Sequence, residues 1–155
     1  MKEVVSNDGL KKIGIRAFAY CHSLEQMTLP STIAEVGSYA FYKCNSLKEV
    51  VLNEGLQRIG INIFEECTAI ERITIPSTLM CINMEAFKGC FNLRDVVLHD
   101  GLQKICNGTF CGCKSLRSIT FPSTMVEIEQ KVFNLCEDMR EVVLNDGLQK
   151  IGSMA

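Results

Sequence analysis

The sequence predicts a solenoid, in which coils of equal length stack along one axis and share a continuous hydrophobic core. The first observation behind this prediction is a strict repeat. Phenylalanine recurs every 23 residues, at Phe18, Phe41, Phe64, Phe87, Phe110 and Phe133. Periods of about 20 to 50 residues are typical of solenoids and other repeat architectures. The second is the composition: the chain has 155 residues, 47% hydrophobic and 22% charged, which suffices for one domain with a buried core.

Other positions keep the register of these phenylalanines. Hydrophobic residues stand eight and five residues before each Phe, and six, nine and eleven residues after it. A cysteine stands three residues after each Phe, at Cys21, Cys44, Cys67, Cys90, Cys113 and Cys136. With Phe itself, seven columns hold their register through six copies. Chance does not produce such a pattern, so the 23-residue unit is a structural repeat.

Each unit contains one segment typical of a short β-strand. The stretch from Leu47 to Leu52 alternates hydrophobic and polar residues in its last part, which predicts a strand with one buried face. Residues 38–44, ahead of the next strand, are expected to form a short turn of helix. A single coil of this length cannot bury its own apolar face, so the copies must stack. The strands then form one parallel sheet.

A longer period overlies the short one. After the strand, alternate copies read Pro-Ser-Thr, as at Pro30-Ser31-Thr32, and the copies between them read Asn-Glu-Gly or a close variant, as at Asn53-Glu54-Gly55. Both sequences favour a turn. The repeating unit is therefore a pair of 46 residues.

The repeat resembles a known family. The unit Leu-x-x-Ile-x-Ile-Pro-Ser-Thr-x-x-x-Ile-x-x-x-Ala-Phe-x-x-Cys, clearest from Ile70 to Cys90, is similar to the leucine-rich repeat of the BspA type. The resemblance covers essentially the whole chain, although Ile63, Thr109 and Val132 replace the alanine before Phe. It implies a leucine-rich repeat solenoid of the α/β-type horseshoe class. In that fold a parallel sheet lines the concave face, and short helical or irregular turns form the convex face.

The resemblance also implies a role in binding or adhesion, since many relatives are surface proteins of bacteria and protists. We therefore predict a non-catalytic scaffold that binds a protein or glycan ligand on the concave sheet face. A structural spacer within a longer surface protein is the alternative. The net charge of -2 argues against nucleic acid as a partner. No hydrophobic run approaches the roughly 20 residues of a membrane helix, so no membrane insertion is expected.

Residues 1–155 are predicted to form a single domain of about six copies. The chain opens at a strand and closes just before the next Phe would come, and neither end has the polar capping repeat that solenoids use. We therefore expect a segment of a longer array. Its open ends predict end-to-end self-association at high concentration.

The chain has nine cysteines. Neighbouring strands are about 4.8 Å apart, and parallel side chains at that spacing miss the roughly 3.5–4.5 Å between Cβ atoms that a disulfide needs. The six cysteines of the Phe-x-x-Cys column are therefore expected to be free, buried thiols. Three more lie off the column: Cys81, Cys106 and Cys111.

Cys111-Gly112-Cys113 is the one pair with the look of a redox motif, and a thiol-redox protein using Cys111 and Cys113 is the alternative function. No spacing supports a catalytic set, a cofactor or a metal site. His22 is far in sequence from the group Cys106, Cys111 and Cys113. His99 occupies a turn position that is asparagine in other copies. The acidic turn residues recur only on every second coil, too far apart to share a calcium ion. They are Asp8, Glu54, Asp100 and Asp146.

Candidate partner-binding residues are arginines next to the predicted strands. Arg94, Arg117 and Arg140 stand seven residues after successive phenylalanines, and Arg72 stands in the next column. Three like charges on neighbouring coils repel one another, unless Asp95 and Glu141 pair with them or an anion binds. Arginine suits bidentate contacts with carboxylate or phosphate, which favours an acidic ligand. Free thiols favour a reducing compartment and the resemblance favours a cell surface, so the sequence leaves the localisation open.

Overall fold

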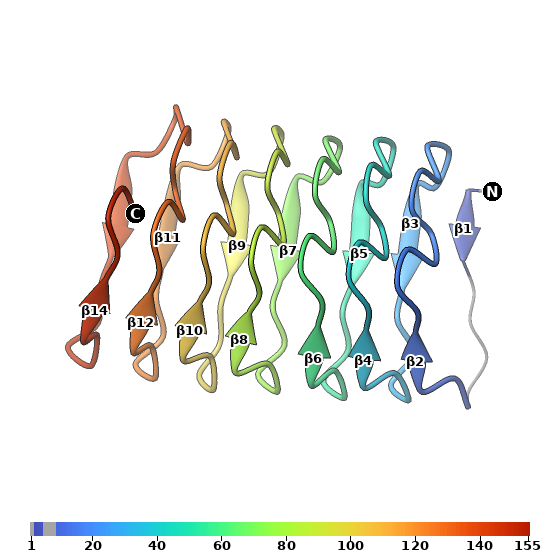
Figure 1. The fold of residues 1–155 in the computed structure, drawn as a ribbon, viewed down its shortest axis with the longest axis horizontal. Helices are drawn as coiled ribbons and strands as arrows, with labels where there is room; N and C mark the ends of the chain where they lie inside the picture. Colours follow the sequence, from blue (N-terminus) through green and yellow to red (C-terminus); the bar gives the residue numbers. More distant parts are fainter. Residues whose placement is uncertain (1, 5–8) are drawn as a thin grey trace.

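Residues 2–4 and 9–155 are described by the computed structural model (Figure 1). In this part of the chain each coil contributes a strand that precedes the Pro or Asn turn. We call the sheet of these strands the long-strand sheet. Its members are β1 (Glu3–Val4), β3 (Gln26–Thr28), β5 (Glu49–Val51), β7 (Arg72–Thr74), β9 (Asp95–Val97), β11 (Ser118–Thr120) and β13 (Glu141–Val143).

A second strand follows the turn in every coil and belongs to what we call the short-strand sheet. Its members are β2 (Lys12–Ile13), β4 (Glu35–Val36), β6 (Arg58–Ile59), β8 (Cys81–Ile82), β10 (Lys104–Ile105), β12 (Glu127–Ile128) and β14 (Lys150–Ile151). This sheet was not predicted from the sequence. Its strands have only two residues each, which is too short for an alternating pattern to show.

The predicted stack of 23-residue coils is confirmed. All paired strands are parallel, and the register shifts by one repeat, so that Met27 lies opposite Val50 and Lys104 opposite Glu127. Figure 1 shows the coils side by side in one row from β1 to β14. Equal coil length is what keeps the columns aligned, because one inserted residue would turn every side chain of a strand to the opposite face.

The phenylalanine column forms the centre of the core. Neighbouring rings stack with centroids 5.2–5.6 Å apart from Phe18 to Phe110 and 6.0 Å apart between Phe110 and Phe133. Their planes are within 15° of parallel, a stacked arrangement that adds to the energy of burial. The four inner rings are fully buried, whereas the two end rings are only partly covered.

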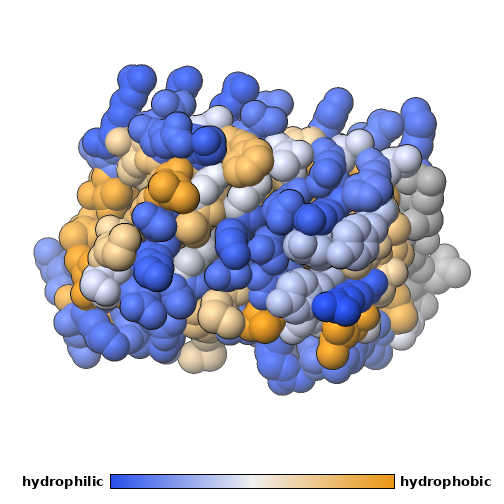
Figure 2. All heavy atoms as spheres, turned by 45° about the horizontal axis from the view of Figure 1, so that its top comes forward, coloured by the Kyte–Doolittle hydropathy of each residue, from blue (hydrophilic) through white to orange (hydrophobic). Residues whose placement is uncertain are grey.

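The same columns become exposed at the C-terminal coil. Val142, Leu144 and Ile151 occupy positions that are buried or half-buried in the inner coils, yet here each is between 39% and 52% exposed. Figure 2 shows hydrophobic side chains gathered at the surface toward the left end of the view. The rest of that face is mostly hydrophilic, with smaller hydrophobic areas. In this chain the last coil therefore presents apolar surface to solvent.

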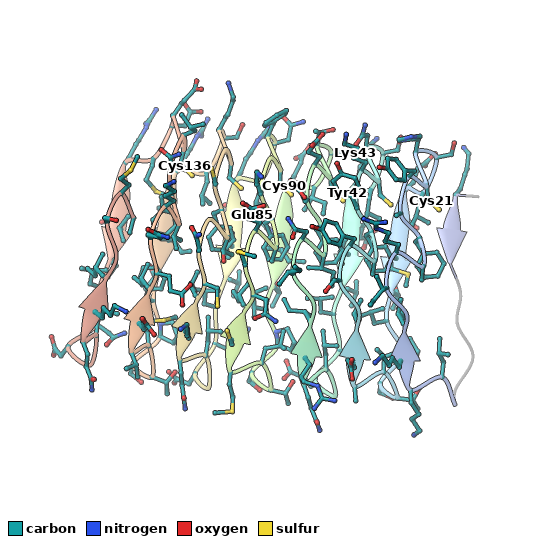
Figure 3. All side chains as sticks on the ribbon, in the orientation of Figure 1. Cys21, Tyr42, Lys43, Glu85, Cys90 and Cys136 are labelled. Atoms are coloured by element: carbon teal, nitrogen blue, oxygen red, sulfur yellow. The ribbon has the colours of Figure 1, made fainter. Side chains whose placement is uncertain are left out.

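The cysteine column lies beside the phenylalanines, and its thiols have a defined role. Each Sγ from the second coil onward donates a hydrogen bond of 3.0–3.2 Å to the carbonyl oxygen of the phenylalanine one coil earlier. Figure 3 shows Cys21, Cys90 and Cys136 along the same edge of the stack. All nine cysteines are free. The predicted burial of this column is confirmed for Cys44, Cys67, Cys90 and Cys113, whereas Cys21 and Cys136 in the end coils are half-buried.

The expectation of a helical turn over residues 38–44 is wrong, and no helix occurs in residues 2–4 and 9–155. Instead, the N–H groups of Tyr39, Phe41 and Lys43 donate to carbonyl oxygens of the next coil, on Ile61, Ile63 and Glu65. A helix would direct those N–H groups to carbonyls within its own segment. Consecutive turns satisfy the backbone here, and the residues two before and two after Phe have positive φ in each coil from Arg16 to Leu135. Of the two convex-face alternatives, the irregular turns are confirmed.

The 46-residue period has a structural counterpart. The long strands form separate hydrogen-bonded groups β1-β3-β5, β7-β9 and β11-β13. Within one pair of coils, Asn53 Nδ2 donates to the carbonyl oxygen of Pro30 at 2.6 Å. Between pairs, the Glu54 carboxylate accepts two hydrogen bonds from Ser77, one from the backbone N–H at 3.0 Å and one from the side-chain hydroxyl at 2.8 Å. The Asp100 carboxylate likewise accepts from Ser123 Oγ at 3.0 Å. Two of the acidic turn residues thus connect successive pairs of coils, while Asp8 lies outside the described residues.

Candidate binding surface

The predicted arginine stripe lies at the edge of the long-strand sheet. Arg94, Arg117 and Arg140 directly precede β9, β11 and β13, and all three are exposed. A backbone hydrogen bond of 2.8 Å from the Arg140 N–H to the Arg117 carbonyl oxygen holds two of them in register, and the Arg94 N–H donates to Glu71 on the preceding coil, also at 2.8 Å. Within the described ranges, none of the three guanidinium groups has an ion-pair partner within 4.0 Å.

Arg72 differs from the stripe. Its Nη2 lies 2.9 Å and its Nε 3.3 Å from Asp95 Oδ2 on the next coil. Asp95 is therefore bound to Arg72 and does not neutralise Arg94. The stripe we define from here on consists of Arg94, Arg117 and Arg140.

A groove of about 520 Å³ lies beside the stripe. It is open between β9 and β11, where the hydrogen-bonded ladder of the long-strand sheet is interrupted. Its lining includes the exposed side chains of Val97, Ser118 and Thr120. A partner on this sheet would meet a row of positive charge next to a shallow, mainly β-branched surface.

The short-strand sheet carries a ladder of alternating charges. Lys12 Nζ lies 2.6 Å from Glu35, which also accepts from Arg58 at 2.9 Å. Farther along, Lys104 lies 3.0 Å from Glu127, which also pairs with Lys150. Hydrogen bonds from Lys12 and Arg58 lower the pKa of Glu35. The sequence contained this signal, because the residues that directly precede the buried Ile/Val column alternate in sign.

Cys81 interrupts that ladder, and the sheet is interrupted at the same place. Strands β2-β4-β6 form one hydrogen-bonded group and β8-β10-β12-β14 another. At the junction the Asn83 side chain donates from Nδ2 to the carbonyl oxygen of Ile59 at 2.6 Å. A groove of about 850 Å³ opens over β4, β6 and β8, lined in part by Gly60, Met80 and Cys81.

The redox alternative based on Cys111 and Cys113 gains no support from the geometry. Cys113 is fully buried and donates to the carbonyl oxygen of Phe87 at 3.2 Å. Burial raises its pKa well above the usual range, which disfavours the reactive thiolate. Cys111 is half-buried and lies 3.9 Å from Asn134 Nδ2. The structure instead places two other thiols together, Cys81 and Cys106, whose Sγ atoms are 3.4 Å apart.

An aromatic cluster on the turns was also missed in the sequence. Tyr42 makes edge-on contacts with Tyr20 and Tyr39, with centroids 5.3 and 5.7 Å apart. Lys43 Nζ lies 5.1 Å from the centre of the Tyr42 ring, and Arg16 lies 5.2 Å from that of Tyr39. Figure 3 labels Tyr42 and Lys43, which belong to the turn end of the second coil. The available signal was that the chain's three tyrosines all fall within residues 20–42.

The described residues offer neither a cluster of metal ligands nor a membrane-spanning helix. No group of three or more His, Cys, Asp or Glu among them is arranged to hold a metal ion. Nor does this part of the chain contain a helix long and apolar enough to cross a membrane.

The stacked parallel coils, the Phe-x-x-Cys spine and the absence of a helix in the described residues define a β-rich leucine-rich repeat solenoid. The family comparison agrees with this class. The BspA type leucine rich repeat region matches residues 1–107 and 80–155 in six copies. The chain belongs to this family, whose members are typically repeat scaffolds for protein binding or adhesion rather than catalysts.

Solved structures of bacterial leucine-rich repeat proteins have the same fold. The T. pallidum leucine rich repeat protein is 30% identical, with a TM-score of 0.90 over 97% of this chain and 73% of that one. A leucine-rich repeat protein from Eubacterium ventriosum is 22% identical, with a TM-score of 0.93 over 99% of this chain and 42% of that one. A leucine rich cell surface protein from Faecalibacterium prausnitzii is 24% identical, with a TM-score of 0.65 over 90% and 46%. None of the curated proteins compared with the chain matches it.

Proposed function

We propose that the chain is a non-catalytic scaffold that binds an acidic segment of a protein partner across its long-strand sheet. One observation carries this proposal: Arg94, Arg117 and Arg140 are exposed on successive coils and, in the described structure, have no ion-pair partner. Like charges held in a row repel one another. A carboxylate ligand relieves that repulsion and matches the bidentate donor geometry of arginine.

The spacing of the stripe fits an extended peptide that runs across the strands. Hydrogen-bonded strands are about 4.8 Å apart and the ladder is open between β9 and β11, so the outer two arginines are separated by at least about 10 Å. A peptide in the polyproline II conformation rises about 3.1 Å per residue with three residues per turn, so its side chains at positions i and i+3 lie on the same face about 9 Å apart. Two carboxylates with that spacing reach Arg94 and Arg140, and the backbone between them lies over Arg117.

The variant Arg117→Glu tests this proposal. We expect it to weaken binding of a synthetic polyglutamate peptide about tenfold. The reversal removes one attractive pair and adds a repulsive one, each worth up to about 1 kcal/mol at an exposed site. Binding is measured by fluorescence anisotropy at low and high salt, and added salt is expected to reduce the difference.

Lys11→Glu is the matched control, because Lys11 is exposed, carries the same charge, and lies beside β2 on the other sheet. It should bind the peptide as the unmodified chain does. Equal loss in both variants would mean that only net charge matters, and the stripe would be abandoned as a site. Binding of heparin but not of the peptide would replace the protein partner with an anionic glycan. Binding of neither would favour the structural spacer.

We also propose that chains of this sequence associate end to end, because the last coil exposes Leu144 and Ile151 from otherwise covered columns. Sedimentation equilibrium is expected to show a rising mean mass in the hundred-micromolar range. Ile151→Glu should lower that mass, whereas Val97→Glu, exposed in the middle of the stack, should not. A strictly monomeric chain throughout this range would contradict the proposal.

A further inference from the structure

Two thiols on adjacent coils lie in contact outside the cysteine column. Cys81 is in β8 and Cys106 follows β10 directly, and their Sγ atoms are 3.4 Å apart. The register pairs Cys81 with Lys104 and Ile82 with Ile105, so Cys106 lies one position beyond the paired residues. This diagonal offset brings the two sulfurs together, whereas the cysteines of the column lie directly behind one another and bond to backbone carbonyls. Both thiols of the pair are half-buried rather than enclosed.

The charge ladder places Cys81 between two cations. Its column on the short-strand sheet reads Lys12, Glu35, Arg58, Cys81, Lys104, Glu127 and Lys150. Strict alternation of sign would put an acidic residue at position 81, between Arg58 and Lys104. A cysteine there can supply the missing negative charge only as a thiolate, and neighbouring cations favour that form.

The two thiols differ in acidity. The hydrogen bond between the two thiols lowers the pKa of Cys81, with a further contribution from Lys104, while burial, Glu129 and Glu127 oppose the shift. The same hydrogen bond, with burial, raises the pKa of Cys106. Lys104, which pairs with Cys81 in the strand register, also lies 3.0 Å from Glu127 and 2.6 Å from Glu129, and these two ion pairs hold its side chain in place. Cys81 lines the groove and Cys106 does not, and this position together with the direction of its pKa shift favours Cys81 as the nucleophile of the pair.

Solvent and small oxidants can reach Cys81. It lines the groove of about 850 Å³ over β4, β6 and β8, at the point where the ladder between β6 and β8 is interrupted. The adjoining Met80 is 58% exposed. By contrast, the column cysteines of the inner coils, Cys44 to Cys113, are fully buried.

We propose that Cys81 and Cys106 are an oxidation site that forms a reversible disulfide between two coils when a hydroperoxide reacts with Cys81. The Cys81 thiolate attacks the hydroperoxide oxygen that bears the hydrogen. The S–O bond forms as the O–O bond breaks, which leaves a sulfenic acid, and the departing oxygen takes a proton from solvent to leave as water or an alcohol. The Cys106 sulfur then attacks the Cys81 sulfur, the S–O bond breaks, and the hydroxyl leaves as water with the Cys106 proton. The two sulfurs lose two electrons in total and the peroxide gains them.

Formation of the bond requires a small movement. A disulfide is about 2.05 Å long, so the sulfurs must approach by roughly 1.4 Å from their present contact. Two side chains at the open end of a groove can make that adjustment by rotation about their side-chain bonds. An added thiol reduces the disulfide again by thiol–disulfide exchange. The product joins the coils of β8 and β10 covalently.

The folded 155-residue chain, treated with hydrogen peroxide and then alkylated, tests the proposal. Intact mass spectrometry should show loss of two hydrogens, and peptide mapping should find a Cys81–Cys106 crosslink with the column cysteines still reduced. Cys81→Ser should abolish the loss. Cys106→Ser should leave a sulfenic acid at Cys81 that dimedone traps, and Cys111→Ser, the matched control at another half-buried thiol, should form the crosslink normally.

A crosslink at any other pair of cysteines, or an unmodified Cys81 after oxidation of Cys111, would overturn the proposal. So would full persistence of both Cys81 and Cys106 as thiols. Mapping of the unmodified chain does not depend on whether a variant folds, so the result is decisive even if one substitution is destabilising. Peptide binding at the arginine stripe is a separate measurement, and its outcome does not bear on this one.

Discussion

The variant Phe87→Ala is expected to lower the free energy of unfolding by about 3–5 kcal/mol, the usual cost of removing a buried phenylalanine. The Phe87 ring stacks on Phe64 at 5.5 Å and on Phe110 at 5.6 Å and is fully buried. Its loss leaves a cavity in the middle of the spine, and each coil is stabilised only by its two neighbours. Urea unfolding followed by circular dichroism measures the change.

Phe91→Ala is the matched control for this substitution. Phe91 is the same residue type in the same coil, but it is 44% exposed, and Lys114 Nζ lies 5.9 Å from the centre of its ring. We expect a change of at most about 1 kcal/mol, since surface substitutions usually have small effects. Similar losses for Phe87 and Phe91 would show that the stacked column is not the main source of stability.

The second large effect is expected for Gly60→Ala, which should destabilise the chain by about 2–3 kcal/mol, at the upper end of the range for overpacking. A Cβ at Gly60 would lie 2.2 Å from the Ser38 nitrogen and 2.4 Å from its Cα. Both atoms belong to the backbone of the preceding coil, so no side-chain rotation relieves the clash. The coils must move apart, and the urea midpoint should fall accordingly.

Gly14 supplies the control, because it occupies the same column and a Cβ there would meet nothing within 4 Å. No coil of the described structure covers that side of Gly14. Gly14→Ala is therefore expected to change stability by no more than about 0.5 kcal/mol. If the two alanine variants were equally stable, close packing of the coils at Gly60 would be refuted.

The interrupted ladder between β6 and β8 follows a change in this glycine column. Gly37 and Gly60 let the backbones of successive coils approach closely. The next positions in the column are Asn83 and Cys106, which carry side chains, and Asn83 replaces a strand hydrogen bond with one from its own amide. The groove and the thiol pair therefore lie where two kinds of coil junction meet.

The repeat, the direction of the strands, the buried Phe and Cys columns and the exposure of the arginine stripe were all readable in the sequence. The reason is that equal spacing forces equivalent residues into equivalent places. Once coils of 23 residues stack, a column in the sequence becomes a column in space. The pairing of coils also followed from the alternation of Pro-Ser-Thr with Asn-Glu-Gly turns. The bonds within a pair, such as Asn53 to Pro30, and between pairs, such as Ser77 to Glu54, did not.

Other features were decided by contacts between coils. The turn segments lack a helix because their N–H groups donate to the next coil, a choice that local sequence around Phe41 does not reveal. Asp95 bonds to Arg72 rather than to the stripe, because register places those two residues opposite each other. Cys81 and Cys106 are 25 residues apart, two more than the repeat, and only the diagonal geometry of adjacent parallel strands brings their sulfurs into contact. Periodicity determined which residues share a column, and the tertiary structure determined how neighbouring columns meet.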